Sequence, residues 1–245
     1  MPHISIKAEP IFHLLGIAIT NSYLASIIVI IATLFIGLYY KKQITASKKS
    51  GFFYTLHFIL SSIYDMFYSV VGENIYFFFP LLISFFLYIL FQNWFGLVPG
   101  VGSILVKIQE NHETALVPLL RGNTADLNTT LALGVASISM IQFYGIQFLG
   151  FKTYISKFIN LTNPISFFIG ILEVLSEVSK IFSFSFRLFG NIFAGEVLLT
   201  IVAFLVPVLA SFPFLLLELF VGFIQALVFT MLTSVFLNAA VQKHH

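Results

Sequence analysis

The sequence has no cysteine and few charged residues, which make up 9% of its 245 positions. The lack of cysteine excludes a disulfide framework, thiol chemistry and a cysteine-bound metal site. Soluble domains carry about 25% charged residues, and a water-soluble core of this size could not bury the 59% of residues that are hydrophobic. We therefore expect the lipid bilayer to be the solvent for most of the chain.

Other signals are missing as well. The formal net charge of +2 is too small to indicate a nucleic-acid-binding surface. There is no phosphate-binding loop, and the six histidines are not clustered at metal-ligand spacing. No cleavable signal peptide is expected, because no basic n-region precedes the first long apolar run, which starts near Ser22. We expect this chain to bind no nucleotide, metal or other cofactor.

The hydrophobic pattern predicts an all-α membrane protein, a single polytopic domain over residues 1–245 with five membrane helices. The expected helices are roughly residues 22–40, 76–98, 127–151, 164–206 and 213–241. The first would span about 28 Å, one bilayer core, whereas the last two would be about 64 and 44 Å long. Helices of that length in a thin slab tilt, kink or break. We predict that the last two are strongly tilted and packed together as an antiparallel hairpin.

Residues 52–71 form a different kind of segment. Apolar and polar residues fall on opposite faces at helical spacing, as in an amphipathic helix that lies at the membrane interface. The apolar set is Phe52, Leu56, Ile59, Ile63, Met66 and Val70, and the polar set is Thr55, Ser62, Asp65 and Ser69. Residues 101–126 are expected to be a polar loop, with Asp126 either capping the next helix or lining an outer channel entrance.

Lysine and arginine are distributed unevenly over the expected loops. One side of the membrane carries Lys41, Lys42, Lys48, Lys49, Lys152, Lys157 and Lys243, and the other carries Lys7, Lys107 and Arg121. The positive-inside rule then places the N-terminus outside and the C-terminus in the cytoplasm.

Charges inside the expected membrane segments occur only in the last two. They are Glu173, Glu177, Lys180, Arg187, Glu196 and Glu218. Each costs roughly 2.5–3.5 kcal/mol at the centre of a helix on insertion scales, and such groups usually face a wet cavity and mark ion pathways. In the predicted orientation, Glu173 and Glu177 lie in the cytoplasmic half, Arg187 near the middle, and Glu196 and Glu218 toward the outside.

Arg187 shares one helix face with small and polar residues, namely Ser183, Gly190, Asn191 and Ala194. Small residues let another helix approach closely in lipid, so this face is a candidate contact surface for another chain that supplies a carboxylate. A guanidinium stays protonated. Arg187 can therefore hold a passing carboxylate in its ionised form and block direct proton leakage.

Two offset polar paths are expected on either side of Arg187. Glu196 points away from Arg187, about 180° around the helix and about 13 Å along its axis. Glu196 can meet Glu218 near the outer surface as a coupled pair of carboxylates, with Gln225 further along the same face. The inner path consists of Glu173, Ser176 and Glu177. Two half-paths form no continuous pore, so a mobile partner must carry the ion between them.

The sequence resembles subunit a of the F-type ATP synthase over nearly its whole length. The most specific match is SFRLFGNIFAGE (residues 185–196), preceded by LEVLSEVSK (172–180) and followed by IQALVFTMLTSVFLNAA (224–240). Weaker matches follow the expected order: AITNS (18–22), FQNWFGLVPG (91–100) and TADLNTTLALG (124–134). RLFGN followed by AGE favours the bacterial or chloroplast type.

The resemblance implies a non-catalytic, proton-translocating subunit with two half-channels that face a rotating ring of c subunits, each with a mid-membrane carboxylate. Arg187 matches the arginine that faces the ring, and the positions linked to the half-channels match Glu196, Glu218, Asn191, Gln225 and, on the cytoplasmic side, Glu173. It also implies b-type peripheral stalk subunits as partners, protons or sodium ions as cargo, ATP synthesis in other chains, and a bacterial inner membrane. Many members have a histidine at one of the positions of Glu196 and Glu218, so the proton order here stays open.

Two other classes of protein remain as alternatives. A self-contained secondary ion transporter would contain internal repeats and broken helices, and we find no repeat. A structural membrane anchor would need no offset charges in the membrane. Purely structural roles also remain open for single residues. Arg187 can bind carbonyl groups at a helix end, Glu196 and Glu218 can form hydrogen bonds, and Asn191 and Gln225 can make interhelical contacts. Glu177 can be a plain interfacial charge, and Lys180 can snorkel or pair with Glu173 or Glu177.

Overall fold

The computed structural model describes residues 8–14, 17–110, 113–158, 163–206 and 211–242. The helices are α1 (Asn21–Ile44), α2 (Gly51–Val71), α3 (Ile75–Phe95), α4 (Leu127–Leu149), α5 (Phe151–Ile155), α6 (Pro164–Leu205) and α7 (Ser211–Val241), with short 3₁₀ turns η1 (Gly72–Asn74) and η2 (Asn123–Ala125). The strands are β1 (Pro10–Leu14), β2 (Ile17–Thr20), β3 (Leu105–Glu110) and β4 (Glu113–Pro118). Five helical stretches of the described part are long and apolar enough to cross a membrane, with α2 and α3 counted as one stretch. The predicted class, an all-α membrane protein, is confirmed.

The end of α1 differs from the prediction. The helix was expected to end at residue 40, but it continues past Lys41 and Lys42 to Ile44. Lysine is a good helix former, and a positive charge in the last turn interacts favourably with the helix dipole. The change from apolar to charged residues therefore marks a change of solvent rather than the end of the helix.

The prediction of a polar loop over residues 101–126 is wrong. This segment contains an antiparallel hairpin in which β3 pairs with β4, from Leu105 with Pro118 to Glu110 with Glu113. Both strands contain β-branched residues among polar ones, which is typical of strands, but the charges of the segment obscured this pattern. A second antiparallel hairpin, β1–β2, precedes α1.

Asp126 caps α4, as the first of its two interpretations predicted. Its side chain accepts a hydrogen bond from the backbone N–H of Asn128 at 3.1 Å. Thr20 and Ser50 cap α1 and α2 in the same way, accepting from Tyr23 and Phe53. These caps satisfy backbone donors that have no partner inside the helix.

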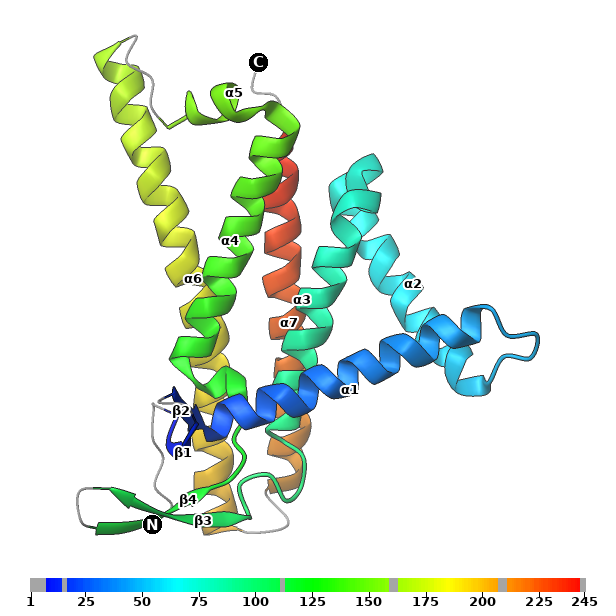
Figure 1. Cartoon of the computed structure of the whole chain (residues 1–245), viewed down its shortest axis with the longest axis vertical. Coiled ribbons are helices and arrows are strands. Elements are labelled where there is room, and N and C mark those ends of the chain that lie inside the picture. Colours follow the sequence, from blue (N-terminus) through cyan, green and yellow to red (C-terminus); the bar gives the residue numbers. More distant parts are fainter. Residues whose placement is uncertain (1–7, 15–16, 111–112, 159–162, 207–210, 243–245) are drawn as a thin grey trace.

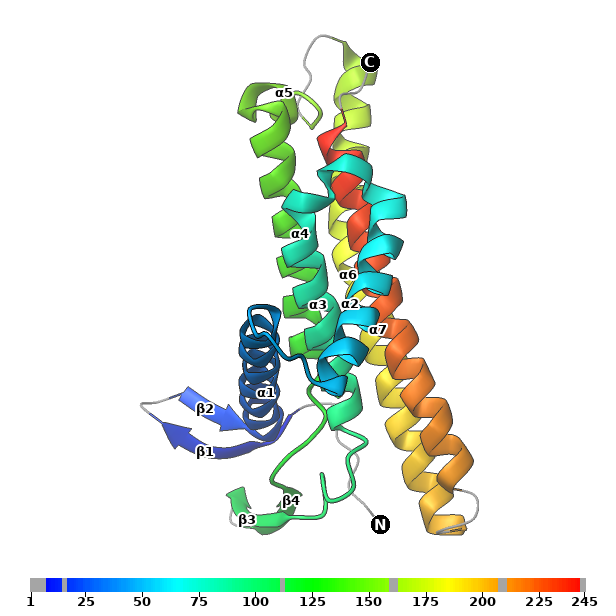
Figure 2. The same ribbon diagram turned by 90° about the vertical axis from the view of Figure 1, so that its right-hand side faces the viewer.

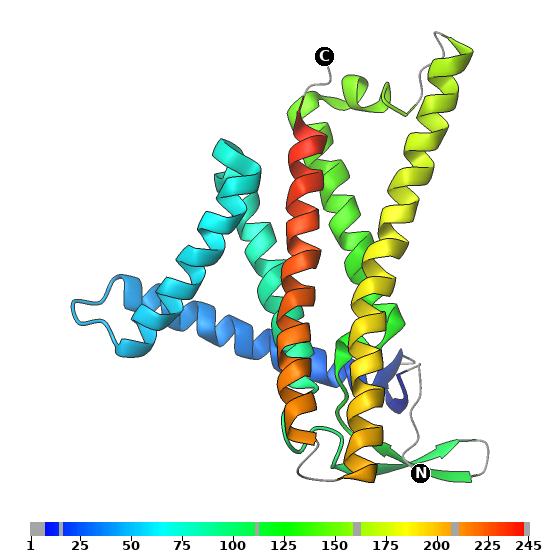
Figure 3. The same ribbon diagram turned by 180° about the vertical axis from the view of Figure 1, so that it is seen from behind.

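Four long helices, α3, α4, α6 and α7, run side by side along the long axis of the molecule (Figures 1 and 2). α7 packs against α3, α4 and α6, and α4 packs against α6. α6 and α7 run in opposite directions and touch, as predicted for a hairpin. Figure 3 shows that they lie close together at the C-terminal end of α6 and diverge toward its N-terminal end, with α4 behind the gap.

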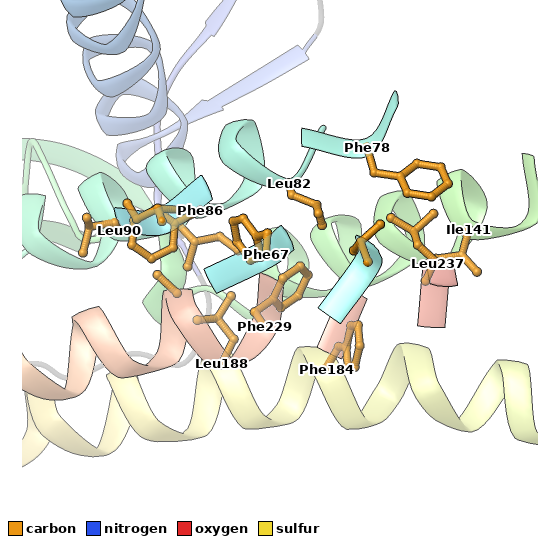
Figure 4. Close-up of a cluster of buried hydrophobic side chains, with 14 of the residues drawn as sticks. Phe67, Phe78, Leu82, Phe86, Leu90, Ile141, Phe184, Leu188, Phe229 and Leu237 are labelled. Carbon is orange, nitrogen blue, oxygen red and sulfur yellow. The ribbon is translucent and has the colours of Figure 1, made fainter. Parts of the chain in front are cut away.

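The apolar core lies where these helices meet α2. α3 contributes Ile75, Phe78, Leu82, Phe86 and Ile89, a helical row that is at most 1% exposed. Facing side chains come from every neighbour and include Phe67, Ile141, Phe184, Leu188, Phe229 and Leu237 (Figure 4). Since lipid tails are as apolar as these side chains, close packing rather than exclusion from water favours their association.

α1 and α2 extend away from this bundle. The buried residues of α1 all lie within residues 21–29, where Ser26 hydrogen-bonds Tyr88 of α3 at 2.8 Å and Asn123 of η2 at 2.6 Å. α2 returns from the far end of α1 to the start of α3, so that the three helices form a triangle (Figure 1).

The polar face of α2 is exposed, as predicted. Its packed residues are Phe53, Ile63, Phe67 and Val71, whereas Phe52 and Ile59 are exposed. The packed face is thus turned slightly from the predicted apolar stripe. The position of α2 at the membrane interface stays a prediction.

The lengths of α6 and α7 limit how they can lie in a membrane. α6 has 42 residues and α7 has 31, so they measure about 63 and 46 Å. To stay within about 30 Å of hydrocarbon, their axes must incline by about 60° and 50° from the membrane normal. α1 runs across the direction of the bundle in Figure 1. Therefore α1, α6 and α7 cannot all be parallel to the membrane normal. Strong tilt of the last two helices stays a prediction that these lengths support.

Gly134 allows the close approach of α4 to α6. A Cβ at this position would lie 2.5 Å from Ser185 Oγ and 2.9 Å from the Ile181 carbonyl oxygen. We predict that Gly134→Val overpacks this contact and lowers the free energy of unfolding by about 1–3 kcal/mol, measured as a lower thermal midpoint in detergent. Gly37→Val in α1 is the matched control, because nothing lies within 4 Å of a Cβ there. Equal midpoints for the two variants would contradict close α4–α6 packing.

Candidate functional site

Arg187 lies near the middle of α6 on an exposed face of the bundle. The five residues that the sequence analysis placed on one contact face are all exposed and form a stripe along α6, here called the arginine stripe: Ser183, Arg187, Gly190, Asn191 and Ala194. The other side of α6, with Ser185, Leu188 and Ile192, is buried. The stripe is therefore free to contact another chain.

The surroundings of Arg187 are apolar. Phe182 and Phe186 beside it are 47% and 53% exposed. Arg187 donates from Nη2 to Ser183 Oγ at 3.2 Å, and none of the ion pairs among the described residues involves it. A cation at the centre of a membrane helix costs roughly 2.5–3.5 kcal/mol on insertion scales. A carboxylate from outside this chain would offset that cost.

Gln225 of α7 lies beside Arg187 rather than beside the outer carboxylates. The two side chains line one shallow depression, together with Phe184, Leu188 and Phe229. The sequence analysis grouped Gln225 with Glu196 and Glu218. The structure places it at the level of the arginine, seven residues or about 10.5 Å along α7 from Glu218.

Glu196 and Glu218 line one large cleft near the end of α6 and the start of α7. Its volume is about 1350 Å³, including space open to solvent, and Asn93 and Arg121 also line it. The structure thus brings together the two carboxylates that the sequence analysis paired. We call this space the outer cleft.

The carboxylate of Glu218 is packed directly against Gly195 of α6. A Cβ at position 195 would collide with both carboxylate oxygens, so the glycine provides the room that Glu218 occupies. Glu218 is only 6% exposed. α3 fixes the same stretch of α7, because Asn93 donates to the Gly222 carbonyl at 2.8 Å and Trp94 donates to the Leu219 carbonyl at 3.0 Å. Contacts with two other helices therefore set the position of Glu218.

Arg121 is the site residue that sequence reasoning missed, since it was counted only as a loop charge. It is 7% exposed, and its Nη2 lies 3.4 Å from Glu196 Oε2. The segment between β4 and η2 brings it onto the outer cleft. No local spacing signals this contact, because 75 positions separate the two residues.

The inner acidic residues, Glu173 and Glu177, bind different partners. Glu173 Oε1 lies 2.8 Å from Lys157 Nζ. Glu177 accepts hydrogen bonds from Lys180 at 2.6 Å and from Gln142 of α4 at 2.9 Å. Lys180 therefore pairs with Glu177, which was one of its predicted alternatives.

Tyr154 of α5 extends this inner network. Its hydroxyl donates to Gln142 Oε1 at 2.6 Å. Burial, with the negative charges of Glu177 and Glu173, raises the pKa of Tyr154 to about 12, so the phenol stays a donor at physiological pH. Glu177 is thus one member of a network that joins α4, α5 and α6, not an isolated interfacial charge.

The three groups of residues are separated along α6. Arg187 lies nine residues from Glu196 and fourteen from Glu173, or about 13 and 21 Å along the axis. Nowhere in the described part of the chain do three or more His, Asp or Glu side chains gather in a way that could hold a metal ion. The chemistry available is that of carboxylates, amides and the cations paired with them, together with the guanidinium of Arg187, which forms no ion pair among the described residues. Carboxylates can hold and pass protons.

Comparison with known proteins identifies the family of the chain. The family model described as ATP synthase A chain matches residues 23–238. A protein named ATP synthase subunit a from Syntrophobacter fumaroxidans is 34% identical over 188 residues, 76% of this chain and 70% of its own length. One of the same name from Moorella thermoacetica is 30% identical over 239 residues, 98% of this chain and 99% of its own. Since the family match covers most of the sequence, the chain belongs to the ATP synthase A chain family.

Proposed function

We propose that this chain is the proton-translocating subunit of an F-type ATP synthase and supplies two offset half-channels to a rotating ring of c subunits. It performs no ATP chemistry itself. Ring carboxylates load and release protons as they pass the arginine stripe, and the resulting rotation drives synthesis in other chains. Membership of the family and the five membrane-spanning stretches support this proposal.

The observation that carries the proposal is the exposure of Arg187 on a stripe of small residues. A ring helix can approach closely over glycine, alanine and serine. Its carboxylate would then meet a guanidinium that is always charged. This pairing keeps the ring carboxylate ionised only while the carboxylate faces α6. Away from α6, an ionised carboxylate without a partner costs far more free energy in lipid than its neutral form.

The outer half-channel is the outer cleft, with Glu196 and Glu218 as its acidic groups. Asn191 on the stripe and Gln225 beside Arg187 lie between this cleft and the passing ring carboxylate. The inner half-channel starts near Glu173 at the other end of α6. These two regions lie about 34 Å apart along the helix, so neither bypasses Arg187.

The partners and orientation follow from the same proposal. The ring covers the arginine stripe, and b-type stalk subunits cover other membrane-exposed surfaces. The N-terminus lies outside a bacterial inner membrane and the C-terminus in the cytoplasm, because the lysines after α1 and α4 then follow the positive-inside rule. Protons are the preferred cargo, with sodium ions as the alternative.

Arg187→Ala tests the centre of the proposal. We expect ATP-driven acidification of inverted membrane vesicles to be abolished, because the facing ring carboxylate would lose a partner whose removal costs about 3–5 kcal/mol in a buried pair. Assembly, checked by pull-down of the complex, should persist. Phe186→Ala is the matched control, since it truncates the adjacent exposed side chain and should leave acidification largely intact. Pumping by an assembled Arg187→Ala complex would make the arginine structural and refute the proposal.

Gly195→Ala tests whether the position of Glu218 matters for transport. The new methyl group would displace the carboxylate. With the overpacking cost of about 1–3 kcal/mol falling on the transfer step, we expect pumping to drop by about 5- to 160-fold. Adding Glu218→Asp should restore part of the rate, because the shorter side chain withdraws from the methyl group. Gly37→Ala, in open space on α1, controls for the substitution itself. Normal pumping by Gly195→Ala would show that transport does not need Glu218 at this place.

A further inference from the structure

We propose that Arg121 holds Glu196 in its ionised form, so that Glu218 is the carboxylate that takes up and passes on the proton in the outer cleft. This inference rests on the proposed function and assigns an order that the sequence leaves open. Arg121 acts as a positioning residue, since it works through Glu196 rather than on the proton itself.

The two carboxylates of the cleft have different surroundings. Glu196 lies 3.4 Å from the guanidinium of Arg121 and is 38% exposed, so it has both a fixed cation and contact with solvent. Glu218 is 6% exposed, and within the described part of the chain it has neither an ion pair nor a hydrogen bond. A cation stabilises an ionised carboxylate, whereas an ionised carboxylate buried without a partner is costly. Glu196 is therefore suited to stay charged and Glu218 to gain a proton.

The charges around the cleft leave no second cation for Glu218. Among the described residues that line it, the segment before η2 supplies Arg121, α6 supplies Glu196 and α7 supplies Glu218. α3 supplies only the neutral Asn93, and residues 96–103 carry no charge. Two carboxylates that share one low-dielectric site do not both ionise readily. Arg121 makes the two carboxylates unequal, because it stabilises the negative charge on Glu196 and not on Glu218.

The proton path follows from these positions. A proton from outside water binds the Glu218 carboxylate and makes it neutral. Glu218 then gives the proton to the ring carboxylate that approaches Arg187 and returns to its ionised form. Gln225 lies about 10.5 Å further along α7 than Glu218 and beside Arg187. It is therefore at the level where the ring carboxylate receives the proton. Glu196 keeps its charge throughout and makes the cleft attractive to protons.

Transport by assembled complexes in inverted vesicles provides the first test. Glu218→Gln should reduce pumping by about 10²-fold or more, the usual contribution of a group that transfers a proton. Arg121→Gln and Glu196→Gln should each reduce it, because each removes one partner of the ion pair between these residues. The double variant Arg121→Gln/Glu196→Gln should pump faster than either single variant. Arg121→Gln with Glu173→Gln is the matched control and should show no recovery, since Glu173 lies at the opposite end of α6.

Infrared difference spectra of the whole complex between acid and neutral pH provide a readout that loss of structure alone would not move. The band of a neutral carboxyl group should lose one component in Glu218→Gln but not in Glu196→Gln. Loss of a component in Glu196→Gln alone, or pumping at the unmutated rate by assembled Glu218→Gln complexes, would overturn the inference. Neither result would refute the proposed function, which fails only if assembled Arg187→Ala complexes pump.

Discussion

The rest of this structure depends on one constraint, a cation that cannot be neutralised on the exposed apolar face of a membrane helix. Arg187 keeps its proton under all physiological conditions, and lipid cannot solvate it. We propose that a carboxylate from another chain lies against this charge and offsets its cost. The small residues of the arginine stripe serve the same end, because they admit a second helix to the distance at which the two charges can pair. Under the proposed function, a partner chain completes this face.

An exposed face of this kind requires that α6 be held from behind. The contacts there are unusually close and depend on glycine. Gly134 of α4 lies against Ser185, Gly195 of α6 lies against the Glu218 carboxylate, and Gly170 lies against the Phe158 carbonyl. At the N-terminal end of α6, where α7 diverges from it (Figure 3), polar bonds from Gln142 to Glu177 and from Lys157 to Glu173 join it to α4 and the segment after α5. These contacts set the rotation of α6 about its own axis, and that rotation decides what the arginine faces.

Sequence reasoning predicted the helices well, because lipid imposes a length and an apolar composition that are visible locally. It also predicted which residues share the face of Arg187, since helical periodicity alone determines this. It failed for the β3–β4 hairpin and for Arg121. The hairpin is a local structure, but its charged residues obscured the strand pattern. The ion pair of Arg121 with Glu196 joins positions 75 residues apart, so no local pattern signals it. Gln225 shows a third limit. Periodicity placed it on the face of Glu218, but only the packing of α7 against α6 showed that it lies beside Arg187.

The outer cleft and the arginine stripe lie on different sides of α6, and this has a consequence for coupling. In the proposed function, a proton passes from Glu218 to a ring carboxylate at the arginine stripe. It reaches the inner half-channel, about 34 Å along α6 from Glu196, only on that carrier. A carrier carboxylate can be charged in front of Arg187 and must be neutral in lipid, because the ionised form there has no partner. Under the proposed function, loading on one side of the arginine and release on the other therefore require the carrier to move through the lipid. A direct leak would need a proton to pass the guanidinium, whose positive charge repels it in a low dielectric. Under the proposed function, the separation of the two acidic regions by Arg187 is what couples ion flow to motion of the partner.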